Sequence, residues 1–293
     1  VIVAPFLKRA VPESIWRRHL TLIVHPGIVG DRGPSALDWA IQEGEPAWGV
    51  TVLQAEAEMD AGPVWASREF PLRAASKADV YRNETTVGAL AAVREALARV
   101  PDWRAGRWQP RALATIADAR GRLRPLMRQA ERALDWARMG SAAILARIRA
   151  ADGFPGVADA LFGQPCHLFD AHPGGRPAGC AGAAPGTVLA RRDGALLRAT
   201  ADGAVWIGHV RRADSPHPFK LPATLAFAAE VAEAAEAAAL PELPATLMTP
   251  ASADPAALGY RELAYRETDD GALGVLSFEF YNGAMSTAQC RRL

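Results

Sequence analysis

The fold expected for the first half of this chain follows from one stretch, Leu22-Ile-Val-His-Pro-Gly-Ile-Val-Gly-Asp-Arg-Gly-Pro-Ser-Ala-Leu-Asp-Trp-Ala-Ile41. Its first residues are apolar and predict a buried strand that leads to His25. Three glycines and two prolines then predict a loop, and the residues after Ser35 predict a helix. Ligands of open α/β sheets usually bind at such strand ends, where the next helix offers backbone donors to an anion or a carbonyl group. The stretch therefore has the architecture of an active site.

The same residues also fit a purely structural interpretation. His25 would then cap the strand through hydrogen bonds, while Asp31 and Arg32 would form a solvated ion pair. The pattern alone favours neither interpretation.

A second cluster, Trp48-Gly-Val-Thr-Val-Leu-Gln-Ala-Glu-Ala-Glu-Met-Asp-Ala-Gly-Pro63, ends a predicted strand in an acidic turn that contains Asp60. An aspartate beside a strand-end histidine can hold the imidazole in one tautomer and raise its basicity. In the alternative, Asp60 only bonds its own backbone before Gly62, as turn aspartates do. Taken without the first cluster, the turn interpretation is the favoured one.

Short apolar runs and helical segments alternate around these two clusters. We predict strands over residues 1–6, 20–24, 48–56 and 64–71, with helices near 12–19 and 35–43. That order is typical of an α/β sheet, and we expect a parallel one. Residues 77–100 predict an amphipathic helix packed on the sheet. The apolar positions of that helix are Val80, Val87, Leu90, Ala91, Val93 and Leu97.

The second half of the chain has a different pattern. Residues 101–119 mix Pro, Gly and Trp as a linker does, and we expect helices over 123–138 and 141–151. Short β-rich runs at 166–169, 186–191, 196–200 and 204–210 predict a small, mostly antiparallel barrel that contains a loop over 172–184. Residues 223–255 predict an Ala/Glu helix and a Pro-rich connector, and 260–266 with 274–280 a hairpin that opens a third unit.

Composition limits the class of protein. A chain of 293 residues, half of them hydrophobic, has room for about two domains. A net charge of +1 gives no strong field toward nucleic acid or anionic membranes, so we expect small molecules or proteins as partners. No apolar run approaches the ~20 residues of a membrane-spanning helix. Three widely spaced cysteines, Cys166, Cys180 and Cys290, indicate no metal site and favour a reducing cytoplasm.

Both ends of the sequence are expected to be cuts within a longer protein. Val1 begins inside a predicted strand, and the helix that starts after Ser286 stops after about two turns. We therefore expect residues 1–293 alone to be a poor catalyst.

The two clusters together resemble the formyltransferases that use formyl-tetrahydrofolate. Five motifs of that family occur here in the same order. They are His25-Pro26, Arg32-Gly33-Pro34, Trp39-Ala40-Ile41, Gly49-Val50-Thr51 and Asp60-Ala61-Gly62. One position departs from the family pattern, because its catalytic asparagine falls on Ile23, which cannot donate a hydrogen bond to an oxyanion.

Longer segments of the sequence resemble the HypX/HoxX family of hydrogenase maturation proteins. The matching segments are Ala4 to Trp16, His25 to Gly27 with Gly30 to Ser35, Ala150 to Gly156 and Phe280 to Thr287. The resemblance implies an incomplete formyltransferase-like domain over 1–105 and a small β-barrel domain over 106–215. It further implies a helical, Pro-rich linker over 216–258 and the start of an enoyl-CoA hydratase-like domain over 259–293.

That resemblance implies a cytoplasmic enzyme that passes formyl from formyl-tetrahydrofolate to coenzyme A. Formyl-CoA would then release carbon monoxide for the iron of [NiFe] hydrogenase, with hydrogenase maturation proteins as partners. His25 would contact the formyl oxygen or move a proton, and Asp60 would orient His25. Folate would lie against Pro5, Phe6, Leu7, Gln54 and Glu58.

The acceptor and its binding residues leave alternatives open. Arg122, Arg124, Arg128 and Arg132 either bind coenzyme A phosphates or form a solvated helix face, and the second reading is favoured. The chain could instead be another folate-dependent formyltransferase with an amine acceptor. A third alternative is a non-catalytic scaffold of hydrogenase maturation.

Overall fold

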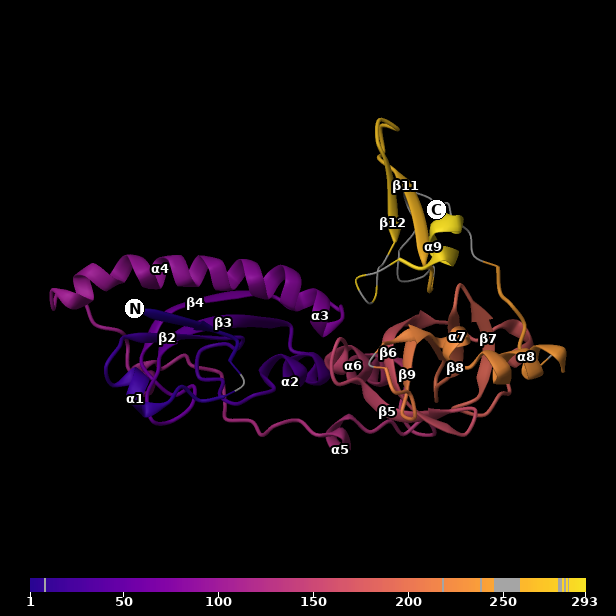
Figure 1. Cartoon of the computed structure of the whole chain (residues 1–293), viewed down its shortest axis with the longest axis horizontal. Coiled ribbons are helices and arrows are strands. Elements are labelled where there is room, and N and C mark those ends of the chain that lie inside the picture. The colour runs from indigo at the N-terminus through magenta and orange to yellow at the C-terminus, as the bar shows by residue number, and fades with distance from the viewer. Residues whose placement is uncertain are drawn as a thin grey trace. The chain divides into compact units, whose positions relative to one another are not determined.

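The computed structural model describes residues 1–7, 9–217, 219–237, 239–244, 259–278, 281, 283 and 285–293. The chain forms two compact units, Val1–Glu131 and Arg132–Leu293 (Figure 1). Within the described ranges, every helix is too short or too polar to span a bilayer.

The first unit is built on a four-stranded sheet in the order β1 (Ile2–Pro5), β2 (Thr21–His25), β3 (Ala47–Gln54) and β4 (Val64–Pro71). The short helix α1 (Glu13–Trp16) connects β1 to β2, and α2 (Ala36–Glu43) connects β2 to β3. All four strands and both helices were predicted from the sequence pattern.

The expectation of a parallel sheet was wrong for these strands. Only β1 and β2 pair in parallel, whereas β2–β3 and β3–β4 are antiparallel. The segment between β3 and β4, residues 55–63, is shorter than the crossover of about a dozen residues that parallel pairing needs. It turns back at Gly62, where an added Cβ would lie 1.9 Å from the Gln54 carbonyl oxygen.

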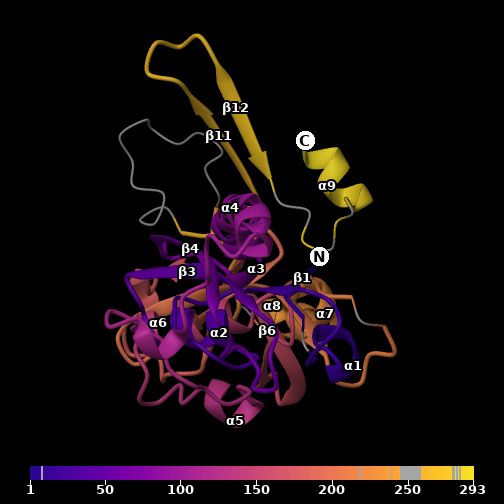
Figure 2. The same cartoon turned by 90° about the vertical axis from the view of Figure 1, so that its left-hand side faces the viewer.

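A long helical segment covers one face of this sheet. It comprises α3 (Lys77–Val80), a π-helical turn η1 (Tyr81–Thr85) and α4 (Thr86–Arg104). Figure 2 shows α4 nearly end-on, lying over β3 and β4. The packed positions of α4 are Gly88, Ala89, Ala92, Ala96 and Val100.

The packing face of the helical segment differs in part from the one expected: Val80 is buried and Val93 packs against the core as predicted, but other positions do not. Val87, Leu90 and Leu97 are 67%, 55% and 40% exposed. Small side chains instead let the helix approach the sheet closely, and they pack with the buried strand residues Leu22 and Val50.

The second unit is built on an antiparallel sheet. Its strands are β5 (Val157–Leu161), β6 (Gln164–Gly174), β7 (Val188–Arg192), β8 (Ala195–Ala199), β9 (Ala204–Arg212) and β10 (Leu221–Pro222). The order is β5-β6-β9-β8-β7, with β10 on β9, and every pair is antiparallel. The predicted antiparallel pairing is confirmed. Among the described strands, β5 and β7 stand at the two ends of this order, so their pairings form an open sheet and not a closed barrel.

Helices pack against this sheet around an apolar core. They are α6 (Ser141–Ala151), α7 (Ala223–Ala226) and α8 (Ala228–Glu236). Short 3₁₀ turns occur at η3 (Ala178–Cys180) in this unit and at η2 (Leu113–Thr115) in the first unit. Ile148, Leu168, Ile207 and Phe227 are fully buried in this core. The sequence pattern missed β5 and placed the end of β6 too early, since β6 continues to Gly174.

The helix expected over 123–138 is wrong for most of its length. Only α5 (Gln129–Arg132) is helical, because residues 121–124 are extended against the loop after β2. The Arg124 amide donates to the Arg32 carbonyl at 2.9 Å, and the Gly121 amide donates to the Val29 carbonyl at 3.0 Å. A distant partner therefore overrides the local helical preference.

The predicted hairpin is confirmed as β11 (Leu263–Glu267) and β12 (Gly274–Phe278), followed by α9 (Thr287–Arg292). Ser286 and Gln289 form a capping box at the start of α9. The last two residues of the predicted second strand and most of the Pro-rich connector lie outside the described residues.

Two leucines of the first unit provide a matched test of this packing. Leu22 is fully buried on β2, and Leu90 is 55% exposed on α4. We expect Leu22→Ala to lower the free energy of unfolding by about 2–5 kcal/mol, because it leaves a cavity in the core. Leu90→Ala should change it by less than about 0.5 kcal/mol. Urea denaturation of both variants checks this; equal losses would contradict the observed orientation of α4.

Candidate active site

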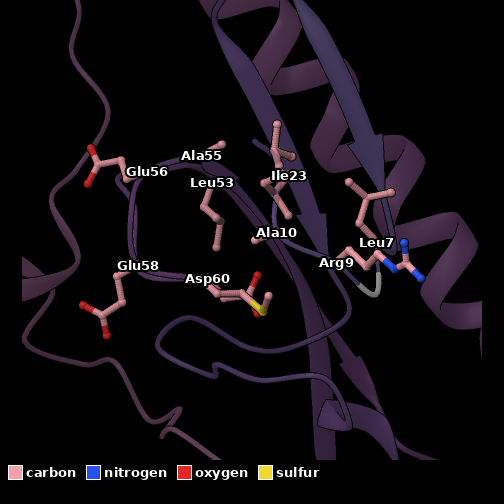
Figure 3. Close-up of a pocket in the computed structure, with 11 residues that line it drawn as sticks. Leu7, Arg9, Ala10, Ile23, Leu53, Ala55, Glu56, Glu58 and Asp60 are labelled. Carbon is pink, nitrogen blue, oxygen red and sulfur yellow. The ribbon is translucent and has the colours of Figure 1, made fainter. Parts of the chain in front are cut away.

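A pocket in the first unit lies beside β2, β3 and the turn after β3 (Figure 3). Figure 3 shows Ile23, Leu53 and Asp60 around its middle, with Glu58 on one side and Arg9 on the other. Most of the lining is apolar, and acidic groups come from the turn after β3. The lining residues are Leu7, Arg9, Ala10, Val11, Ile23, Leu53, Ala55, Glu56, Glu58, Met59 and Asp60.

His25 is buried beside this pocket at the end of β2, where it pairs in register with Thr51 of β3. Its Nδ1 atom lies 3.5 Å from Asp60 Oδ2, and its Nε2 atom lies 2.9 Å from Asp31 Oδ2. His25 itself is not among the residues that line the pocket, whereas Asp60 is. Asp60 therefore lies between the pocket and the imidazole.

The turn after β3 directs the Asp60 carboxylate toward residues far away in sequence. Asp60 has a left-handed backbone with φ of 56°, a conformation that aspartate tolerates better than most residues. The Gly33 amide donates to Asp60 Oδ2 at 3.2 Å. The side chain thus contacts the loop after β2 in addition to facing the pocket.

Asp31 is the residue that the sequence pattern did not place at the site. The predicted solvated ion pair of Asp31 with Arg32 is wrong, since the Asp31 side chain is completely buried and Arg32 pairs with Glu58. Asp31 instead lies against His25, because the loop returns to the end of β2. The glycines and prolines of this loop indicate such a tight return, but they do not tell which side chain points inward.

Several contacts hold the loop after β2 in place. Thr51 Oγ1 donates to the Gly27 carbonyl at 2.8 Å, and Trp48 Nε1 donates to the Pro26 carbonyl at 2.9 Å. The extended residues 121–124 cover the other side of the loop, and an added Cβ on Gly33 would lie 2.2 Å from the Arg124 carbonyl oxygen. The loop is therefore held by both β3 and the segment before α5.

The five residues predicted to hold folate do not all meet at the pocket. Leu7 and Glu58 line it. Pro5 ends β1, and the Phe6 ring packs edge-on against Tyr81 with ring centres 5.6 Å apart. Gln54 ends β3, and its backbone N–H donates to the Pro63 carbonyl at 2.9 Å.

The basic stretch predicted near the domain junction is partly neutralised. Arg122 Nη2 and Arg124 Nη1 both pair with Glu43, at 3.1 and 2.9 Å. Arg124 is only 8% exposed and lies over the Trp48 ring at 5.6 Å. This arginine is therefore not part of a solvated helix face.

The second unit contains another buried acidic group with histidine partners. Asp170 Oδ1 lies 2.5 Å from His172 Nε2, and Asp170 Oδ2 lies 2.7 Å from His209 Nδ1. Burial would raise the pKa of Asp170, but the hydrogen bonds with the two histidines outweigh burial and hold its pKa below the usual range. Among the described residues, no group of His, Cys, Asp and Glu side chains is arranged to hold a metal ion.

Known proteins match both units. Residues 126–217 match the formyl transferase C-terminal domain. The hydrogenase maturation factor HoxX of Bradyrhizobium diazoefficiens is 48% identical over the entire chain, which covers 47% of that relative. A methionyl-tRNA formyltransferase of Granulibacter bethesdensis is 30% identical over 63% of the chain and 54% of that enzyme.

A solved structure matches the fold of nearly the whole chain. It is HypX from Aquifex aeolicus in complex with tetrahydrofolic acid, which is 40% identical and superposes with a TM-score of 0.83 over 99% of this chain and 47% of that one. The chain thus spans about half the length of the relatives that it matches. It is therefore a homologue of the HypX/HoxX hydrogenase maturation factors, with their formyltransferase-like fold.

Proposed function

We propose that the Asp60 pocket is the formyl-transfer site of a HypX/HoxX-type enzyme that moves formyl from formyl-tetrahydrofolate to coenzyme A. The observation that carries this proposal is the placement of Asp60 on the pocket with His25 at 3.5 Å behind it, in a homologue of a protein solved with tetrahydrofolic acid. The complete protein would then release carbon monoxide from formyl-CoA for the iron of [NiFe] hydrogenase.

The pocket lining suits the formyl donor. The apolar side chains of Leu7, Ile23 and Leu53 can contact the flat face of a pterin ring, and Glu58 can accept hydrogen bonds from its amino groups. We keep Pro5, Phe6 and Gln54 in the proposed folate site because Pro5 and Gln54 end β1 and β3 beside these residues and Phe6 follows Pro5.

The proposed transfer needs one bond made, one broken and one proton moved. The acceptor sulfur forms a bond with the formyl carbon, and the resulting tetrahedral intermediate breaks its carbon–nitrogen bond to the folate. The thiol proton leaves toward Asp60 and His25 and is returned to the folate nitrogen. A buried carboxylate–imidazole pair at the pocket wall is suited to this proton transfer.

Ile23 is consistent with a thiol acceptor. It lines the pocket and has no donor for an oxyanion. A thiolate carries no proton that must be removed after it attacks, whereas an amine must lose one, so a thiol acceptor needs less help with deprotonation.

A methionyl-tRNA formyltransferase-like reaction with an amine acceptor is the second candidate, and the 30% identity to the Granulibacter bethesdensis enzyme favours it. Ile23 argues against it. A cytoplasmic location and hydrogenase maturation partners follow from the proposed function, and the three free cysteines fit a reducing compartment.

We expect His25→Ala to abolish formyl transfer in the full-length protein, because it removes the imidazole that receives the proton. The assay supplies formyl-tetrahydrofolate and coenzyme A, and follows tetrahydrofolate release together with carbon monoxide capture by a haem protein. His19→Ala, which changes an exposed histidine of the same unit, is the matched control.

Three outcomes separate the candidates. Both products formed only with both substrates, and lost in His25→Ala, would support the proposal. Tetrahydrofolate release without carbon monoxide would favour another formyl acceptor. No product from the unchanged protein would favour a non-catalytic scaffold.

Ile23→Asn tests the explanation for the isoleucine that stands at the position of the family's asparagine. If the acceptor is a thiol, an added amide donor should leave formyl transfer to coenzyme A close to the unchanged rate. We expect no gain in kcat in the same assay. A large gain would show that Ile23 limits the reaction and would count against the thiol explanation.

A further inference from the structure

We propose that Asp31 is a positioning residue that holds the imidazole of His25 from the side opposite Asp60. It would fix the tautomer with hydrogen on Nε2, so that the Nδ1 lone pair faces Asp60 and the pocket. The catalytic part of this proposal rests on the proposed formyl transfer, whereas the tautomer is a property of the chain itself.

The two ring nitrogens of His25 have unequal partners. Nε2 lies 2.9 Å from Asp31 Oδ2, within hydrogen-bonding distance, whereas Nδ1 lies 3.5 Å from Asp60 Oδ2, beyond it. A neutral imidazole carries a single N–H, and an ionised carboxylate can only accept. The hydrogen therefore belongs on Nε2, and Nδ1 is left as the basic atom.

Burial strengthens this contact. The Asp31 side chain is fully buried and the His25 side chain is 4% exposed, so water competes little for either group. Arg124 Nε lies 3.9 Å from Asp31 Oδ1, so a positive side chain lies beside this carboxylate. Asp60, by contrast, faces the pocket and is free to exchange a proton with a bound substrate.

The backbone around the contact has no room for larger residues. An added Cβ on Gly27 would lie 2.5 Å from His25 Nε2 and 2.6 Å from Asp31 Oδ2. An added Cβ on Gly121 would lie 1.8 Å from the Asp31 amide nitrogen. Glycine at these two positions lets the loop and the extended segment close around the pair.

The arrangement gives the proton a direction. When Nδ1 accepts a proton that arrives through Asp60, the imidazolium lies next to the fixed negative charge of Asp31. An aspartate in this position stabilises the charged ring without taking the proton itself. Return of the proton from Nδ1 restores the starting tautomer.

The tautomer can be measured directly on the chain labelled with ¹⁵N-histidine. Long-range ¹H–¹⁵N spectra distinguish a protonated ring nitrogen from an unprotonated one, and His25→Gln identifies the signals. We expect the neutral ring to carry hydrogen on Nε2. Asp31→Ala should abolish this preference, and Asp31→Asn should retain it because its amide oxygen still accepts a hydrogen bond.

Two further variants guard against a folding effect. Gly27→Ala should disturb the same signals without changing either partner, because its Cβ would enter the contact. Asp38→Ala is the matched control, since it removes a buried aspartate that pairs with Lys77 at 2.9 Å. Hydrogen on Nδ1 in the unchanged chain, or an Nε2 signal unaffected by both Asp31→Ala and Gly27→Ala, would overturn the proposal.

Kinetics of the full-length protein test the catalytic part. Asp31→Asn should lower kcat for formyl transfer by about 10²-fold or more, because the charge that stabilises the imidazolium is lost. The KM for formyl-tetrahydrofolate should stay near that of the unchanged protein, since Asp31 does not line the pocket. An unchanged kcat would overturn the catalytic role, and absence of transfer by the unchanged protein would reject the proposed function while the tautomer measurement still stands.

Discussion

The close return of the loop after β2 onto His25 is the constraint on which the rest of the site depends. A hydrogen atom in place of a side chain at Gly27 leaves space for the Asp31 carboxylate at 2.9 Å from the imidazole. Burial of this pair is tolerable because the carboxylate has a hydrogen-bond partner and a nearby guanidinium. Loop geometry and the chemistry of His25 are thus two results of the same close approach.

The mixed sheet determines which side chains share the pocket. Antiparallel pairing places His25 opposite Thr51, and the turn after β3 then brings Asp60 back beside β2. Ile23 and Leu53 are partners in the β2–β3 register, and both line the pocket. The pocket is apolar where the strands supply its wall, and acidic where the turn does.

The segment before α5 shows how a connection becomes part of a site. Residues 121–124 lie against the loop through backbone hydrogen bonds, and Arg124 brings a buried positive charge close to Asp31. Its guanidinium also pairs with Glu43 at the end of α2. Arg124 was expected on a solvated helix face or, in the alternative, at coenzyme A phosphates, and it instead supports the loop.

The sequence by itself determined the strands and helices of residues 1–104, the place of His25 at a strand end, and the family. These features depend on local periodicity and on ordered motifs, which can be recognised without knowing any distant contact. Only the tertiary structure decided the antiparallel sense of β2–β3 and β3–β4, the small-residue packing face of α4 and the inward position of Asp31. Each of these depends on how closely segments approach after folding, and the same residue patterns are compatible with other arrangements until that approach is known.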